Sequence, residues 1–266
     1  MHSKKYPRTL HAHSSLGTTS DDRFLPRGYV NAFAAMDELV VTEKLDGQNN
    51  CFNRHGVFAR THATPTTHPW DKPLRERWEL IKNDLGDLEV FGENMYGIHS
   101  IAYRELASYF YVFAVREKDR WLSWEEVEFY ARLLDFPTVP TYTVKRPLRE
   151  FVAKERSEEA ALEAWLTDVL GRPWLESTET GGRLGGYDPA TKAPASEGFV
   201  IRNTGSYAAT DGPLAVAENE FGQVMKLVRA GHVKTDVHWT KNWQAASLVD
   251  YGRFGWYGYS FLGAPG

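Results

Sequence analysis

Short apolar runs separated by turn-forming residues dominate the hydropathy pattern of this chain. The runs are rich in Val, Phe, Tyr and Ile, which are typical of β-strands, while Gly, Pro, Asn and Asp gather between them. We therefore predict strands over residues 39–45, 50–60, 87–93, 109–116, 197–203 and 223–229. Because strands and helices do not alternate regularly, the pattern predicts antiparallel or mixed sheets.

Helical periodicity is found in the segments 74–83, 124–134 and 156–170. Ser123, followed three residues later by Glu126, is a capping-box pattern that predicts the start of the second helix. The third helix carries apolar side chains at helical spacing, namely Ala160, Ala161, Ala164, Trp165 and Leu166.

A stretch rich in Gly, Pro, Ser and Thr, residues 177–196, predicts a surface loop. Its "GGRLGG" resembles a phosphate-binding cradle, but no helix is expected to follow it and supply the N-terminal dipole that such a cradle uses. We therefore expect a loop without that role.

Composition indicates a globular chain with one large domain, or with one domain and a small appendage. The 266 residues are 42% hydrophobic and 14% aromatic, enough to bury a full core. The chain contains no apolar run of about 18 residues and its N-terminus lacks the core of a signal peptide, so we expect a cytoplasmic monomer without membrane contact. The lone Cys51 predicts a small buried hydrophobe. With a net charge of -4, nucleic-acid binding would require a local basic patch.

The motif "EKLDG" at the end of the first long apolar run places Glu43, Lys44 and Asp46 close together. A lysine held rigidly before a glycine turn can act as a nucleophile once its amine is deprotonated. On these residues alone, an exposed ion pair is the commoner reading. A strand-end amine of this kind is expected to contribute little to stability.

Four further segments follow in a fixed order: "EVFGENMYG" at 89–97, "YFYVFAV" at 109–115, "SEGFVIR" at 196–202 and "VMKLVR" at 224–229. Together with "EKLDG" they resemble the five motifs of the covalent nucleotidyltransferases, the superfamily of ATP-dependent polynucleotide ligases and mRNA capping enzymes. Glu43, Asn49 and the Glu-Gly-Phe of the fourth motif resemble the RNA ligase 2 group most.

The resemblance implies an α+β chain with the covalent nucleotidyltransferase fold, an ATP-grasp-like ligase adenylation fold of antiparallel and mixed sheets flanked by helices. Residues 1–240 would form the adenylation domain. Residues 241–266 would form a short aromatic and Gly-rich segment, too short for the five-stranded oligonucleotide-binding barrel of DNA ligases and capping enzymes.

The resemblance also implies the roles of the charged residues. Lys44 would attack ATP and hold AMP as a phosphoramidate. Lys226 and Arg60 would contact the phosphates and keep the pKa of Lys44 low. Glu197 would hold Mg²⁺ or Mn²⁺, which prefer oxygen ligands. The histidines lack the spacing of a zinc site.

Nucleoside recognition would fall to the remaining candidates. Phe113 would stack on adenine, although a core position fits its apolar strand equally, and Glu93 would accept from the ribose. Glu43 would help to read the base edge, and Phe199, two residues after the metal ligand, would wall the pocket. Asn49 would orient a phosphate or the RNA end, or else only shape the turn.

Two positions depart from the motifs. Ala114 follows Phe113 where RNA ligases often have aspartate, and Val228 takes the place of the second lysine of the fifth motif. Arg229 and Lys234 are the candidates for that second cation.

The resemblance therefore implies an ATP-dependent RNA ligase that uses Mg²⁺ or Mn²⁺ and joins RNA 5′-phosphate and 3′-hydroxyl ends. A minimal DNA ligase and a ligase-fold module that binds nucleic-acid ends without chemistry are the alternatives.

Overall fold

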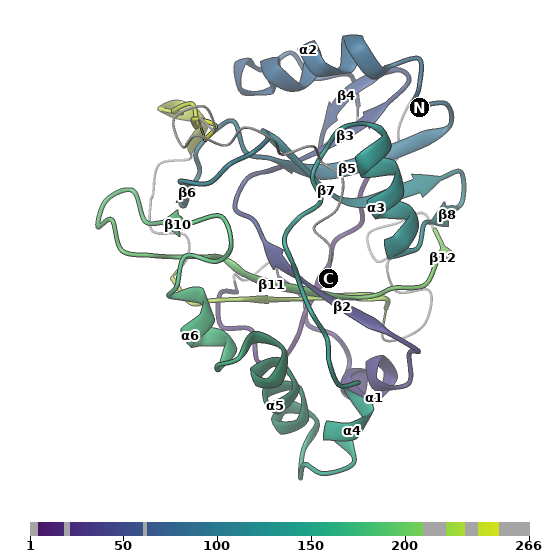
Figure 1. Cartoon of the computed structure of the whole chain (residues 1–266), viewed down its shortest axis with the longest axis vertical. Coiled ribbons are helices and arrows are strands. Elements are labelled where there is room, and N and C mark those ends of the chain that lie inside the picture. Colours follow the sequence, from purple (N-terminus) through teal and green to yellow (C-terminus); the bar gives the residue numbers. More distant parts are fainter. Residues whose placement is uncertain (1–4, 19–21, 61–62, 210–221, 232–238, 250–266) are drawn as a thin grey trace, which may run out of the picture.

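Two β-sheets face each other in the computed structural model, and each carries helices on its outer side (Figure 1). The structure describes residues 5–18, 22–60, 63–209, 222–231 and 239–249. Within these ranges the fold is α+β, with antiparallel and mixed sheets flanked by helices, as the sequence predicts.

The first sheet is mixed, because β1 and β13 pair in parallel while all other neighbouring strands of this sheet pair antiparallel. Its order is β1 (Leu10–His11), β13 (Val224–Val228), β11 (Gly198–Asn203), β2 (Leu39–Lys44) and β9 (Thr141–Tyr142). The helices α1 (Tyr29–Ala34), α4 (Arg149–Val152), α5 (Glu158–Leu170) and α6 (Trp174–Thr178) cover one face of this sheet.

The second sheet is antiparallel throughout. Its order is β12 (Tyr207–Ala208), β8 (Arg120–Trp121), β7 (Phe110–Glu117), β5 (Leu88–Asn94), β3 (Gln48–Asn53) and β4 (Gly56–Ala59). The helices α2 (Lys72–Ile81) and α3 (Trp124–Leu133) pack on this sheet. The small elements are the pair β6 (Ala102–Tyr103) and β10 (Gly186–Tyr187) and the 3₁₀ turns η1 (Pro69–Asp71) and η2 (Trp239–Lys241).

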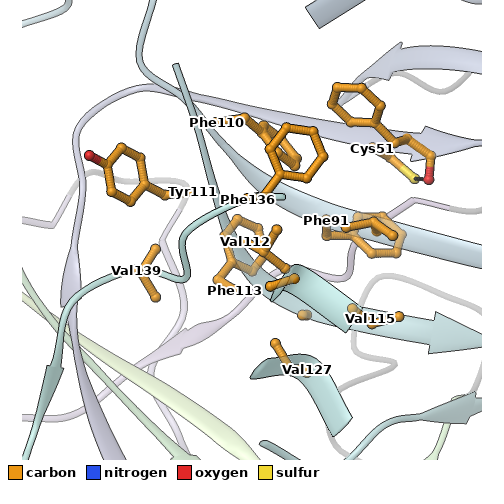
Figure 2. Close-up of a cluster of buried hydrophobic side chains, with 14 of the residues drawn as sticks. Cys51, Phe91, Phe110, Tyr111, Val112, Phe113, Val115, Val127, Phe136 and Val139 are labelled. Atoms are coloured by element: carbon orange, nitrogen blue, oxygen red, sulfur yellow. Dashed lines mark hydrogen bonds between the residues drawn. The ribbon is translucent and has the colours of Figure 1, made fainter. Parts of the chain in front are cut away.

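Each sheet has its own apolar core. Figure 2 shows part of the core of the second sheet, where Phe91, Phe110, Val112 and Val115 are fully buried. Cys51 lies in the same core as a buried free thiol, as predicted. In the core of the first sheet, side chains from the sheet pack against α1, α4, α5 and α6, and Trp165 is fully buried there.

The long predicted elements are confirmed with shifts of one or two residues at their ends, including the capping box of Ser123 and Glu126 at the start of α3. The single strand expected over 50–60 is wrong: Arg54 and His55 form a turn between β3 and β4, in which Asn53 Oδ1 accepts from His55 N at 2.8 Å. The loop expected over 177–196 contains the end of α6 and all of β10.

None of the described helices has the length and apolarity needed to cross a membrane. Of the segment expected over 241–266, the part from residue 250 onward lies outside the described residues, as does Lys234.

Candidate functional site

A cavity of about 630 Å³ lies between the two sheets and contains most of the predicted site residues. One wall comes from β2, β11 and β13, and the other from β3, β5 and β7. A larger and mainly apolar hollow of about 880 Å³, bordered by Leu74 and Phe129, lies between α2 and α3. It does not contain the charged residues of the motifs, so the smaller cavity is the candidate site.

Strand register brings the motif residues of the first sheet onto one face. Lys44 pairs with Gly198, Thr42 with Val200, and Val200 with Lys226. Side chains directly opposite each other in antiparallel strands lie on the same face of the sheet. Thr42, Lys44, Val200 and Lys226 all line the cavity, so segments far apart in the sequence contribute to a single wall.

Lys44 is surrounded by carboxylates. Its Nζ lies 2.6 Å from Glu197 Oε2, and the side chain of Glu197 is only 6% exposed. Burial acts to lower the pKa of Lys44, but the negative charges of Glu197, Glu93 and Asp46 outweigh it, so that the pKa is raised above its ordinary value. The expectation that neighbouring cations keep this pKa low is therefore wrong for the protein without ligands.

Asp46 is a buried member of this group whose role the sequence reasoning did not identify. Its Oδ2 accepts from the backbone N–H groups of Ser100 and Ile101 at 2.8 and 2.9 Å. Its own N–H donates to the Tyr103 hydroxyl at 2.8 Å. Burial, followed by the charge of Glu197, raises the pKa of Asp46 to about 7. The signal was present in "EKLDG", where the aspartate is two residues from the lysine.

Glu93 reaches the cavity from the opposite sheet, where it pairs with Asn49 across β5 and β3. Burial raises the pKa of Glu93 to about 8, although the positive charge of Lys44 opposes this effect. Glu93 Oε1 accepts from Gly47 N at 3.2 Å. A Cβ atom on Gly47 would lie 2.5 Å from the carbonyl oxygen of Asn94, so this turn requires glycine. Asn49 also lines the cavity, and its Oδ1 is buried without a hydrogen-bond partner among the described residues.

Lys226 lies in the same cavity beside two side chains from the N-terminal segment, the buried His11 and the partly exposed Asp22. Its Nζ is 3.6 Å from Asp22 Oδ1, and His11 Nε2 is 3.2 Å from the same oxygen. Burial and the charge of Lys44 lower the pKa of Lys226, in the direction predicted for clustered cations. Burial and the charge of Lys226 lower the pKa of His11 to about 4, so the imidazole is neutral at pH 7. Sequence reasoning missed His11 and Asp22, because their contact with β13 spans most of the chain.

Phe113 belongs both to the core and to the cavity. It is 8% exposed and borders the cavity together with Val139 and Val200. The Tyr6 ring meets it edge-on at 5.1 Å, and the guanidinium of Arg202 lies 6.0 Å from its centroid. The flat apolar end of the cavity is therefore around Phe113.

The carboxylate of Glu43 faces away from Lys44, because neighbouring side chains of a strand point to opposite faces. Glu43 Oε2 accepts from Arg183 N at 2.8 Å. Burial raises the pKa of Glu43 to about 7. Gly182 has a φ of +63°, and a Cβ atom there would lie 2.0 Å from Glu43 Oε1. The "GGRLGG" segment therefore closes over Glu43, although Glu43 also borders the cavity.

The expectation that Phe199 walls the pocket is wrong. Phe199 is 1% exposed and lies in the core of the first sheet, on the helix side, opposite Glu43 in register. Gly198 between Glu197 and Phe199 has a φ of +155°, and this backbone conformation interrupts the strand alternation on which the expectation rested. Val200 takes the position at the cavity instead.

The two arginine candidates differ in position. Arg60 is exposed and lines the cavity. Arg229 donates from its backbone N–H to the Glu197 carbonyl at 3.0 Å, but its side chain is not among the residues that line the cavity.

The donor set for a metal is small. No group of three or more His, Cys, Asp and Glu side chains in the described part of the chain could hold a metal ion. Mg²⁺ in phosphoryl-transfer sites is commonly bound by one or two carboxylates, with water and substrate phosphate as the other ligands. Glu197 is not among the residues that line the cavity, but its carboxylate contacts the cavity-lining Lys44 at 2.6 Å, so it fits such a site and does not fit an all-protein cage.

Residues 37–228 match the model of the family described as RNA ligase. Among curated proteins no match was found. The solved structures that match include an archaeal ATP-dependent RNA ligase with 16% sequence identity and a TM-score of 0.48; the match covers 85% of this chain and 48% of that one.

Two other structural matches have lower TM-scores. A putative ATP-dependent DNA ligase from Aquifex aeolicus is 15% identical, with a TM-score of 0.42 and coverage of 85% of this chain and 50% of that one. A Naegleria gruberi RNA ligase variant with ATP and Mn is 17% identical, with a TM-score of 0.39 and coverage of 79% and 60%. The chain thus spans about half the length of the first of these structures. The family match covers well over half of this chain, and the chain belongs to the RNA ligase family.

Proposed function

We propose that this protein is an ATP-dependent RNA ligase that works through a lysyl-AMP intermediate on Lys44. One observation carries the proposal: Lys44 Nζ lies 2.6 Å from Glu197 Oε2, beside a cavity that Glu93 and Lys226 also line. A lysine, acidic groups and a second cation around one cavity supply a nucleophile together with groups that bind a nucleoside and its phosphates.

In the first step, the lone pair of Lys44 Nζ would attack the α-phosphorus of ATP. A P–N bond forms, the bond to pyrophosphate breaks, and Nζ loses a proton, for which Glu197 Oε2 is the neighbouring acceptor. The amine must be neutral to attack, so the negative charge that raises its pKa has to be offset first. Lys226 supplies part of that positive charge, and Mg²⁺ or Mn²⁺ held by Glu197 would supply the rest and polarise the phosphate.

Nucleoside binding would use the opposite wall of the cavity. Phe113 would stack on adenine, with Val200 as the other apolar surface at that end. Glu93 would accept a hydrogen bond from the ribose, and the unpartnered Oδ1 of Asn49 would gain a donor. Arg60, exposed at the cavity, would contact phosphate oxygens.

The later steps would use the same cavity. The RNA 5′-phosphate attacks the phosphorus of lysyl-AMP, which breaks the P–N bond and returns the amine of Lys44. The RNA 3′-hydroxyl then attacks the activated 5′-phosphate, AMP leaves, and a phosphodiester forms.

The test is a sealing assay on nicked RNA with a 5′-phosphate, ATP and Mg²⁺ or Mn²⁺. We expect sealing that stops with a chelator and is lost in Lys44→Ala, while this variant still seals some pre-adenylylated RNA. A deoxyribose at the 3′-hydroxyl terminus should slow sealing by about ten- to a hundredfold, because a group built to contact the 2′-hydroxyl is left unpaired. Equal rates on nicked DNA would contradict the RNA assignment.

A further inference from the structure

Four aromatic rings line the cavity and have no part in the chemistry above: His68, Trp70, His99 and Trp239. We call them the aromatic shelf. The rings of His68 and Trp70 are stacked, with centroids 4.6 Å apart, and those of His99 and Trp239 are stacked at 3.9 Å. Trp70 and Trp239 meet edge to face at 5.0 Å, so the four rings form one connected aromatic cluster.

Hydrogen bonds to the Trp70 backbone and to the neighbouring Asp71 fix this part of the shelf to the second sheet. Asn94 Nδ2, on β5, donates to the Trp70 carbonyl at 3.1 Å and to Asp71 Oδ1 at 2.8 Å. A Cβ atom on Gly97 would lie 2.9 Å from the Trp239 ring, so the absence of a side chain at this position lets the indole approach. Rings held in this way present a surface that requires little ordering when a ligand binds.

The shelf reaches one of the carboxylates around the nucleophile, and Phe113 has other ring partners. His99 Nδ1 is 4.0 Å from Asp46 Oδ1, two residues from Lys44 in the sequence. Phe113, by contrast, packs with Tyr6 and Arg202. The cavity therefore has two aromatic surfaces, whereas the adenine of ATP needs only one.

We propose that the aromatic shelf stacks on the terminal nucleobase of the RNA end that meets lysyl-AMP. This rests on the proposed function, since it adds the RNA subsite to the same cavity. Aromatic surfaces beside a cationic groove bind unpaired bases with little sequence preference, because every base has a π-face. The cationic partners here are Lys226 and Arg60, which line the same cavity and would hold the backbone phosphate.

The experiment separates the ATP step from the RNA step. Protein labelled with AMP in the absence of RNA is isolated, and transfer of the label to 5′-phosphorylated RNA is measured over a series of RNA concentrations. In Trp70→Ala and Trp239→Ala we expect the RNA concentration for half-maximal transfer to rise about 5- to 100-fold, the range found when a stacking ring is removed. Trp70→Phe, which keeps an aromatic ring, should bring the RNA concentration for half-maximal transfer most of the way back to the wild-type value. Phe129→Ala, at an exposed aromatic outside the cavity, is the matched control.

Abasic substrates identify the strand that stacks. RNA without its terminal base at the 5′-phosphate end or at the 3′-hydroxyl end is compared in wild type and Trp70→Ala. Loss of the terminal base at the 5′-phosphate end, the end that meets lysyl-AMP, should raise the half-maximal RNA concentration of wild type by about the same factor and that of Trp70→Ala by no more than twofold, as expected for two changes to one contact. An effect confined to the 3′-hydroxyl end would contradict the proposal.

Unchanged RNA dependence in both tryptophan variants would overturn the proposal. An equal loss of labelling by ATP in the same variants would also overturn it, because the shelf would then bind the adenine of ATP. Failure of the proposed function itself would look different: wild type would take up no label before any RNA is added.

Discussion

Removing the ammonium of Lys44 should destabilise the protein in a pH-dependent manner. In the folded protein Lys44 faces Glu197 at 2.6 Å and offsets the charges of Glu93 and Asp46. Removal of one partner of a buried ion pair costs about 3 to 5 kcal/mol when the remaining charge stays ionised. Because Lys44 is 25% exposed, we expect a loss of about 2 to 3 kcal/mol for Lys44→Ala at pH 8. The expectation from sequence, that this amine contributes little to stability, is thereby revised.

The dependence on pH follows from the carboxyl groups left behind. Burial already raises the pKa of Asp46 to about 7 and of Glu93 to about 8, and removal of Lys44 raises both further. An acid whose pKa is raised in the folded state contributes stability below its unfolded pKa and loses it as the pH rises. At pH 5 these groups are protonated in the folded variant, so its free energy of unfolding should lie less than about 1 kcal/mol below that of wild type.

Urea unfolding of wild type and Lys44→Ala at pH 5, 6, 7 and 8 measures this difference. Lys72→Ala is the matched control, because Lys72 pairs with Glu76 at 3.7 Å on an exposed helix surface and should change stability by less than about 0.5 kcal/mol at every pH. A Lys44→Ala deficit that is the same at pH 5 and pH 8, or no larger than that of the control, would refute the reasoning.

Two further predictions concern glycine and acid positions of the site. Gly198→Ala should destabilise by more than about 2 kcal/mol, because the new Cβ would lie 1.9 Å from the Leu227 carbonyl oxygen; Gly205→Ala, whose nearest atom is at 3.4 Å, should be nearly neutral in the same urea titration. Glu93→Gln keeps an acceptor for Gly47 N but cannot ionise. Because the raised pKa of Glu93 makes wild type lose stability as the pH rises, the free energy of unfolding of Glu93→Gln should increase relative to that of wild type by about 1 to 3 kcal/mol between pH 5 and pH 8. An unchanged pH profile for Glu93→Gln would contradict the raised pKa, and equal effects of the two alanine variants would contradict the steric argument.

The long elements could be predicted because each has enough residues to show a period. β7 and α5 are examples, with eight and thirteen residues. Six described strands have only two residues and could not be predicted, because two residues show no alternation and form only where a neighbouring strand supplies the hydrogen bonds. They are β1, β6, β8, β9, β10 and β12. The turn at Arg54 was missed although Asn53 and Gly56, which favour turns, flank it, because the apolar runs before and after it were read as one strand.

The candidate site was predictable to the extent that motif residues carry it. Lys44, Glu93 and Lys226 come from separate motifs and line one cavity, and Glu197 contacts Lys44. The contact of Asp22 with Lys226 depends on tertiary packing, which local patterns do not encode.

The side-chain directions were less predictable than the positions. Phe199 was misplaced because alternation was assumed to continue through Gly198. The raised pKa of Lys44 was missed because the number of carboxylates that meet at the cavity depends on how two sheets pack, which no single segment reveals.

The most direct test of the central claim is identification of the residue that becomes labelled by ATP. The protein is incubated with radiolabelled ATP and Mg²⁺ or Mn²⁺, digested, and the labelled peptide is sequenced by mass spectrometry, with Lys44→Ala in parallel. We predict AMP attached to Lys44, with release of pyrophosphate and no label in the variant. Absence of label in wild type, or label on another lysine that persists in Lys44→Ala, would contradict the proposed lysyl-AMP mechanism.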